Sequence, residues 1–225
     1  MEVAADPDEA VRGVADGATV LIGGFGLAGH PIALIDALRR TGVRDLTVVS
    51  NNAGNGTTGL AALLAAGMVR KIICSFPRQV DSFVFDRLYR GGKIELEVAP
   101  QGNLAERIRA AGAGIGAFYT PTGVGTLLAE GKETRVIEGR EHVLELPIRG
   151  DVALIRAHRA DRMGNLVYRK TARNFGPVMA TAAALTVAEV EEVVPTGTLD
   201  PETVVTPSIH VDRVVVARRD AKEGS

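Results

Sequence analysis

Residues Val20 to Pro31 read VLIGGFGLAGHP, and they say more about the fold than any other stretch of the chain. A short apolar run, Val20 to Ile22, is typical of a buried strand, and a glycine-rich bend follows it. Pro31 then opens a stretch with apolar residues at helical spacing, and proline favours the first position of a helix. A strand, a glycine loop and a helix N-terminus in this order place backbone N–H groups where they can face an anion. We therefore predict that an acidic ligand approaches this backbone closely.

The same segment matches the glycine pattern of dinucleotide-binding proteins, with Gly24, Gly26 and Gly29 in the three glycine positions. In a true fingerprint the third glycine lies within the helix, and an acidic residue about 20 positions further on binds the ribose. Pro31 leaves Gly29 outside the expected helix. The next expected strand is followed by two asparagines instead of an acidic residue. Both mismatches argue against a nicotinamide or flavin site.

Composition narrows the class of protein. The chain has 225 residues, 26 of them basic and 27 acidic, with a net charge of -1, so nothing indicates a nucleic-acid-binding surface. A single cysteine excludes a disulfide within the chain and suits a reducing compartment. The acidic N-terminus does not resemble a signal peptide, and the apolar runs are shorter than a membrane span. We expect a cytoplasmic protein that binds neither nucleic acid nor membrane.

Strand and helix signals alternate along the first half of the chain, after a short helix capped by Asp6. The expected strands are 19–23, 46–50, 71–75 and 94–99, and the expected helices are 31–40, 60–66, 80–90 and 103–111. This order predicts an α/β fold with a mostly parallel open sheet and helices on both faces. The second half is less regular: 112–131 resembles a loop, and the further expected elements are strands at 152–158, 185–190 and 213–217 and a helix at 177–184. Since no segment has the composition of a linker, we expect a single domain over residues 1–225.

In an open parallel sheet, ligands bind beyond the carboxyl ends of the strands. The loops that leave such ends are 24–29, 51–56, 76–79 and 100–102. They offer backbone N–H groups, the amides of Asn51, Asn52 and Gln101, and the guanidinium of Arg78. These loops contain no Asp, Glu, Lys or Cys, and His30 beside them is the one candidate base. The site is therefore predicted to stabilise an oxyanion without supplying a nucleophile of its own.

Sequence motifs occur along nearly the whole chain: Asp16 to Pro31, Ser50 to Gly54, Pro100 to Arg107, Phe118 to Gly123, Gly164 to Leu166 and Thr171 to Phe175. Together, and in this order, they resemble the A subunit of family I coenzyme A transferases. The resemblance implies a three-layer fold that this family shares with certain isomerases. It also implies a two-step exchange of coenzyme A between carboxylic acids. The substrates would be a coenzyme A thioester and a free acid, with no metal and no permanently bound cofactor.

In this family the B subunit supplies a glutamate that attacks the acyl-CoA thioester, and a glutamyl-CoA thioester forms through an anhydride. Covalent catalysis of this kind divides one difficult displacement into easier steps. The resemblance therefore implies that the chain works only with a B subunit, in a heterodimer or a heterotetramer. A sugar-phosphate isomerase is one alternative, but it would need a catalytic acid or base within this chain. An acyl-CoA-binding module without catalysis is another.

The resemblance also assigns roles to individual residues. Gln101 matches the glutamine whose side-chain amide contributes to the oxyanion hole; the alternative is that it caps the helix beginning nearby. Asn51 and Asn52 would hold the acid or the thioester carbonyl, although asparagine is also a common turn residue. Arg173 and Asn174 belong to a family motif, and they order either the active-site wall or the subunit interface, or are purely structural.

The glycine loop matches the segment of the family that contacts coenzyme A. Its residues are Gly23, Gly24, Phe25, Gly26, Leu27, Ala28 and Gly29. A tight turn that needs positive φ angles would select the same glycines, and one loop can satisfy both needs.

Two further segments, 74–86 and 55–64, resemble the branch of the family that acts on 3-oxoadipate more than the acetoacetate branch. The implied reaction moves coenzyme A from succinyl-CoA to 3-oxoadipate, in aromatic-compound catabolism, and a 3-oxoacid such as acetoacetate is the alternative acceptor. Both 3-oxoadipate and succinate keep a distal carboxylate, which a guanidinium pairs well. Arg78 is therefore a candidate for selecting dicarboxylic acids, and an exposed arginine at a strand end is the alternative.

Other reactive side chains point to no separate chemistry. Cys74 lies in an apolar strand, where a small core residue is expected, because reactive cysteines need an electropositive and accessible setting. The four histidines have no ligand spacing, and no Cys/His cluster indicates a metal site.

Overall fold

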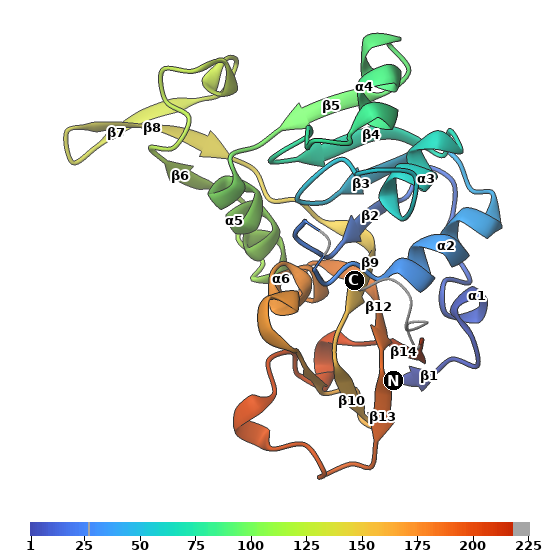
Figure 1. The fold of residues 1–225 in the computed structure, drawn as a ribbon. Helices are drawn as coiled ribbons and strands as arrows, with labels where there is room; N and C mark the ends of the chain where they lie inside the picture. Colours follow the sequence, from blue (N-terminus) through green and yellow to red (C-terminus); the bar gives the residue numbers. More distant parts are fainter. Residues whose placement is uncertain (27, 218–225) are drawn as a thin grey trace.

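The centre of the protein is an eight-stranded sheet whose neighbouring strands all run parallel (Figure 1). The structure is a computed structural model, and it describes residues 1–26 and 28–217. The strand order is β1-β14-β12-β9-β2-β3-β4-β5. The bounds are β1 Glu2–Val3, β2 Thr19–Ile22, β3 Leu46–Val49, β4 Val69–Cys74, β5 Glu95–Val98, β9 Gly150–Arg156, β12 Ala183–Val190 and β14 Arg213–Val216. The prediction of a mostly parallel open sheet is confirmed.

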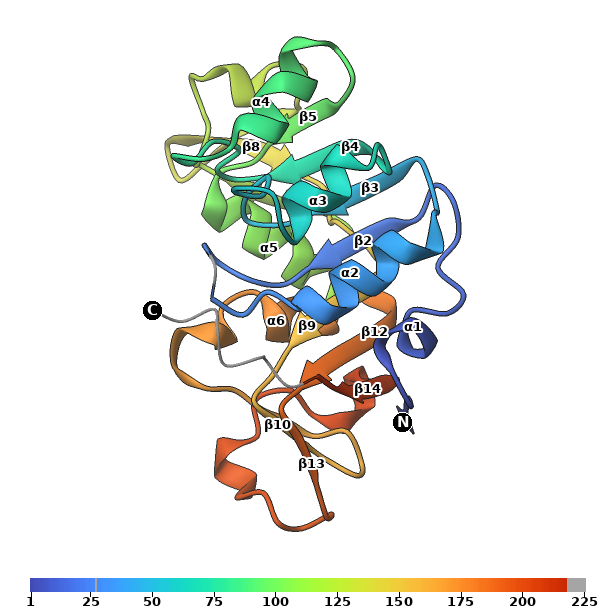
Figure 2. The same ribbon diagram turned by 45° about the vertical axis from the view of Figure 1, so that its right-hand side comes forward.

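Helices cover both faces of this sheet, as Figures 1 and 2 show. One face carries α1 Pro7–Ala10, α2 Ile32–Thr41, α3 Leu60–Ala65 and α4 Phe83–Arg90. The other face carries α5 Gln101–Gly112 and α6 Gly176–Ala180. A separate buried core lies under each set of helices. The fold therefore has three layers.

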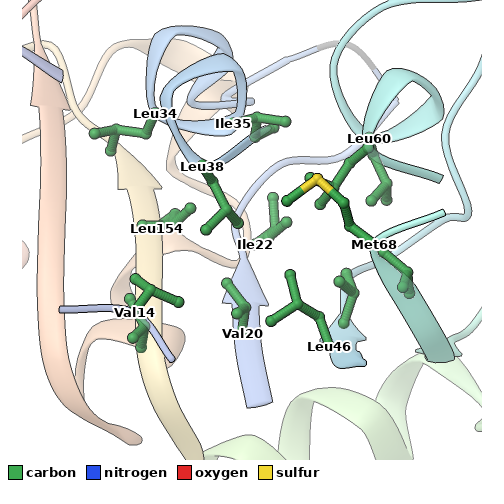
Figure 3. Close-up of a cluster of buried hydrophobic side chains, with 14 of the residues drawn as sticks. Val14, Val20, Ile22, Leu34, Ile35, Leu38, Leu46, Leu60, Met68 and Leu154 are labelled. Carbon is green, nitrogen blue, oxygen red and sulfur yellow. The ribbon is translucent and has the colours of Figure 1, made fainter. Parts of the chain in front are cut away.

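Successive residues of the central strand belong to opposite cores. Val20 and Ile22 pack into the core under α2, whereas Leu21 packs into the core under α5 and α6. Alternate side chains of a strand point to opposite faces, so a strand covered on both sides must be apolar at every position. Figure 3 shows the first of these cores, with residues Leu34, Ile35 and Leu38 of α2 over Val20, Ile22 and Leu154. This packing is why the run from Val20 to Ile22 has no polar alternation.

Two small sheets lie outside the main one. The first contains β6 Phe118–Thr120, β7 Thr134–Ile137 and β8 Arg140–Glu145, and the second contains β10 Arg159–Asp161, β11 Leu166–Val167 and β13 Glu192–Val194. The expectation of a loop over 112–131 is therefore wrong at Phe118–Thr120. The helix expected at 177–184 is also shorter, since α6 ends at Ala180 and β12 begins at Ala183.

None of the helices in the described ranges is both long and apolar enough to cross a membrane.

Candidate active site

The glycine loop is a tight hairpin at the carboxyl end of β2. Phe25 N donates to Ala28 O at 2.9 Å, and Ala28 N donates to Phe25 O at 3.0 Å. Gly24, Gly26 and Gly29 have φ angles of 124°, 60° and 78°, in the region that other residues rarely adopt. The turn interpretation of these glycines is therefore confirmed. Leu27, also predicted to contact coenzyme A, lies outside the described residues, and a coenzyme A contact of the loop stays a prediction.

The side chain of His30 packs against this loop at Gly24. A Cβ atom at Gly24 would lie 2.4 Å from His30 Cδ2, so the imidazole occupies the space of the missing side chain. The His30 ring is buried, and burial lowers its pKa, although a hydrogen bond with the Gly26 backbone opposes that shift. The ring is therefore neutral at pH 7, and a neutral buried ring is a poor partner for a phosphate.

An internal carboxylate occupies the N-terminus of α2. Glu189 Oε2 accepts from Ala33 N at 2.9 Å and from Leu34 N at 3.3 Å. Glu189 lies on β12 and is 2% exposed, and Arg156 Nη1 donates to its other oxygen at 3.1 Å. A carboxylate at this place stabilises the helix dipole and the unpaired N–H groups. The helix start that we predicted to face an acidic ligand is instead occupied by the protein itself.

The four predicted loops meet at one cavity of about 350 Å³. Its lining residues are Phe25, Asn51, Ser75, Phe76, Gln79 and Gln101. They follow β2, β3, β4 and β5, whose carboxyl ends lie at the same edge of the sheet. The prediction that these loops converge is confirmed. Not one of the six lining residues is acidic, which leaves the cavity without a carboxylate nucleophile of its own.

Two side-chain amides and a hydroxyl form a hydrogen-bonded group in this cavity, which we call the amide cavity. Gln101 Nε2 donates to Asn51 Oδ1 at 3.1 Å, and Ser75 Oγ lies 2.9 Å from the same oxygen. Gln101 is the first residue of α5, but its side chain binds Asn51. A primary amide has two N–H groups, so one N–H of Gln101 orients the side chain and the other remains available to a ligand. We did not predict a role for Ser75; its position directly after a buried strand was the available signal.

Asn52 has a different role in the structure. Its side-chain oxygen accepts from Gly54 N at 2.8 Å, and the residue is buried. This is the local turn that asparagine commonly forms. Asn52 is not among the residues that line the amide cavity, so its contact with substrate stays a prediction.

Arg78 lies on the surface next to this cavity, without lining it. Its Nε is 2.6 Å from Asp86 Oδ1 on α4, and its side chain is 54% exposed. An exposed ion pair of this kind stabilises the fold little. A substrate carboxylate would have to replace Asp86 as its partner, and the selection of dicarboxylic acids by Arg78 stays a prediction.

The motif that includes Arg173 and Asn174 packs against the glycine loop (Figure 2). Asn174 Nδ2 donates to Ala28 O at 3.0 Å and to Thr171 O at 2.8 Å. A Cβ atom at Gly29 would lie 2.6 Å from Ala172 O. Asn174 therefore attaches its own turn to the glycine loop, and a role of Arg173 or Asn174 in the active-site wall or the subunit interface stays a prediction.

The remaining candidates are Cys74 and any side chains that could hold a metal ion. Cys74 is fully buried, and burial raises the pKa of its thiol to about 12, so the thiolate is absent at neutral pH. Within residues 1–26 and 28–217, no three His, Cys, Asp or Glu side chains are grouped so that they could hold a metal ion.

With this geometry established, the comparison with known proteins identifies the class: residues 4–217 match the coenzyme A transferase family, and the chain belongs to it. It is 68% identical over 206 residues to the A subunit of 3-oxoadipate CoA-transferase from Pseudomonas putida, covering 92% of this chain and 89% of that protein. The corresponding protein of Acinetobacter baylyi is 65% identical, over 94% of this chain and 93% of that protein.

A relative with a different name is somewhat less similar. The A subunit of succinyl-CoA:3-ketoacid coenzyme A transferase from Xanthomonas campestris is 55% identical, over 94% of this chain and 87% of that protein. Among solved structures, the apoenzyme of an acyl-CoA transferase from Escherichia coli O157:H7 superposes with a TM-score of 0.83 at 24% identity. The alignment covers 96% of this chain and 47% of that chain, so this chain spans about half of the solved one. This likeness confirms the fold.

Proposed function

We propose that this chain is the A subunit of a transferase that moves coenzyme A from succinyl-CoA to 3-oxoadipate in aromatic-compound catabolism. The observation that carries the proposal is the cavity in which Gln101 and Asn51 bring amide groups together without an acidic residue among the lining side chains. Such a cavity stabilises a carbonyl oxygen that becomes negative, but it needs a nucleophile from elsewhere. A glutamate of the B subunit supplies that nucleophile.

The proposed reaction has two halves. The first transfers coenzyme A to the glutamate in two acyl transfers, and the second transfers it to the acceptor acid by the same two steps in the opposite order. The partner's glutamate carboxylate attacks the thioester carbonyl and forms a new C–O bond. The C–S bond then breaks, so coenzyme A leaves as a thiolate and an acyl-glutamyl anhydride remains. The thiolate then attacks the glutamyl carbonyl, which releases succinate and leaves a glutamyl-CoA thioester. The acceptor acid takes the coenzyme A by the same steps in reverse. Each tetrahedral stage places negative charge on a carbonyl oxygen, which the second N–H of Gln101 stabilises.

A second chain is part of this proposal. Both of the 3-oxoadipate relatives described above are named as the A component of a transferase. We propose a heterodimer with a B subunit, or a heterotetramer that contains two such pairs. The substrates are a coenzyme A thioester and a dicarboxylic acid, and no permanently bound cofactor takes part.

Reconstitution with the B subunit of the same organism tests this function. We expect no coenzyme A transfer by the isolated chain, and transfer from succinyl-CoA to 3-oxoadipate once the partner is added. Mass spectrometry after incubation with succinyl-CoA should find the covalent coenzyme A on the partner. Turnover by the isolated chain, or the adduct on this chain, would contradict the proposal.

The choice of acceptor is supported by the higher identity to the 3-oxoadipate relatives than to the 3-ketoacid relative. For Arg78→Ala we expect a loss of about ten- to a hundredfold in kcat/KM with 3-oxoadipate, the value of one charge-assisted hydrogen bond to a carboxylate. Acetoacetate, which has no distal carboxylate, should lose little.

Arg70→Ala is the matched control, because Arg70 is also half-exposed and pairs with a carboxylate, Glu95, at 3.0 Å. It should leave both acceptors unaffected. Equal losses of the two acceptors in Arg78→Ala would exclude Arg78 as the selecting residue.

A further inference from the structure

A second cavity, of about 660 Å³, adjoins the amide cavity, because Phe25 lines both. Its lining residues are Phe25, Ala28, Lys170, Thr171, Arg173 and Asn174. Phe25 lines both cavities and is 48% exposed. An extended ligand can therefore reach from one cavity to the other across this single side chain.

Two cations without carboxylate partners line the second cavity. Lys170 and Arg173 are exposed, and neither forms an ion pair within 4.0 Å in the part of the chain that the structure describes. Arg156, by contrast, pairs with two carboxylates. Exposed cations that line a cavity without a counter-charge favour an anionic ligand there.

The turn that carries the two cations is attached to the glycine loop. Both belong to the 3-10 turn Lys170–Arg173, which Asn174 fastens to Ala28 through its side-chain amide. Lys170 has a φ angle of 51°, an uncommon conformation for a residue other than glycine. Backbone strain of this kind often occurs at ligand sites. The turn therefore holds the two side chains beside the loop.

The helix start nearby does not serve the same ligand. Glu189 accepts from the N–H groups of Ala33 and Leu34, so the positive end of α2 is already neutralised within the protein. A negatively charged group that approaches the glycine loop finds its positive charge at Lys170 and Arg173 instead.

We propose that Lys170 and Arg173 bind the phosphate groups of coenzyme A while its thioester lies in the amide cavity beside Gln101. This inference rests on the proposed function, because it assigns a place to the far end of the same substrate. Coenzyme A carries its phosphates at the end opposite to the sulfur, so the two cavities receive its two ends. Lysine and arginine both bind phosphate, arginine through a bidentate fork.

The test compares two thioesters on the reconstituted pair: succinyl-CoA, and succinyl-pantetheine, which lacks the phosphates. In the double variant Lys170→Ala/Arg173→Ala, we expect KM for succinyl-CoA to rise by about ten- to a hundredfold, as for the loss of charge-assisted hydrogen bonds. KM for succinyl-pantetheine and kcat for both substrates should stay unchanged. Lys170→Arg/Arg173→Lys, which keeps both charges, should retain most of the affinity for succinyl-CoA.

Arg90→Ala/Lys93→Ala is the matched control, since these are also two exposed and unpaired cations of the described chain, outside the cavity lining. It should behave like the wild type. An equal loss with both thioesters in the Lys170/Arg173 variant would overturn the proposal. Failure of that variant to assemble with the partner in gel filtration would also overturn it, because the cations would then contact the partner chain.

These outcomes are distinct from failure of the proposed function. If the wild-type pair transfers no coenzyme A, the function fails. Direct calorimetric titration of the pair with coenzyme A and with pantetheine still tests the cations, because the variant should lose affinity for coenzyme A alone.

Discussion

Gln101→Ala should lower kcat of the reconstituted pair by about 10²–10³, the usual effect of removing one oxyanion-hole donor. The reason is the position of Gln101 in the amide cavity, where Asn51 orients its amide and leaves one N–H for the substrate oxygen. The interaction is made mainly in the transition state, so KM should change little. Steady-state kinetics with succinyl-CoA and 3-oxoadipate measure both constants.

Asn55→Ala is a suitable control, because the Asn55 amide binds the backbone of Asp81 and does not line the amide cavity. It should retain kcat. If Gln101→Ala kept a kcat within a few-fold of the wild type, Gln101 would not belong to the oxyanion hole.

Glu189→Ala should destabilise the chain by about 3–5 kcal/mol, because the substitution leaves Arg156 as a buried charge that has lost a partner. It also removes the acceptor of two N–H groups at the start of α2. Urea denaturation followed by circular dichroism gives the change in the free energy of unfolding. Glu189→Gln keeps an acceptor oxygen for the helix, so it should be less destabilising than the alanine variant.

Glu106→Ala is the matched control: Glu106 forms an exposed ion pair with Arg109, three residues away on α5. Such pairs contribute about 0–1 kcal/mol, so this variant should unfold almost like the wild type. Equal stability of the Glu189 and Glu106 variants would contradict the role of Glu189 as the internal cap of α2.

The parallel sheet could be predicted because the uninterrupted apolar sequence of its strands indicates that both faces are buried. Val20 to Ile22 is continuously apolar, as a strand covered on both faces must be. The convergence of Asn51 and Gln101 followed from the same order, because the carboxyl ends of parallel strands share one edge. The outlying β7 has no such signal: all four of its residues are exposed, so no apolar pattern distinguishes it from a loop.

The cap of α2 could not be predicted from the sequence around the helix, because the capping residue comes from a distant strand. Glu189 lies 156 positions from Ala33, and only the folded sheet brings β12 to the helix start. A signal was nevertheless present, because a glutamate within the apolar strand 185–190 must find a partner if it is buried. Arg156 lies in the neighbouring strand β9 and is that partner. The amide cavity was easier to predict than this cap, because its lining residues come shortly after the strands in the sequence.

The internal cap also limits how this sequence can evolve. Its three glycines already match the nucleotide-binding pattern, but they cannot direct the N–H groups of Ala33 and Leu34 to a phosphate while Glu189 binds them. Loss of this carboxylate leaves the buried Arg156 with one of its two partners, so a change toward a new cofactor starts from a less stable protein unless β9 and β12 change together.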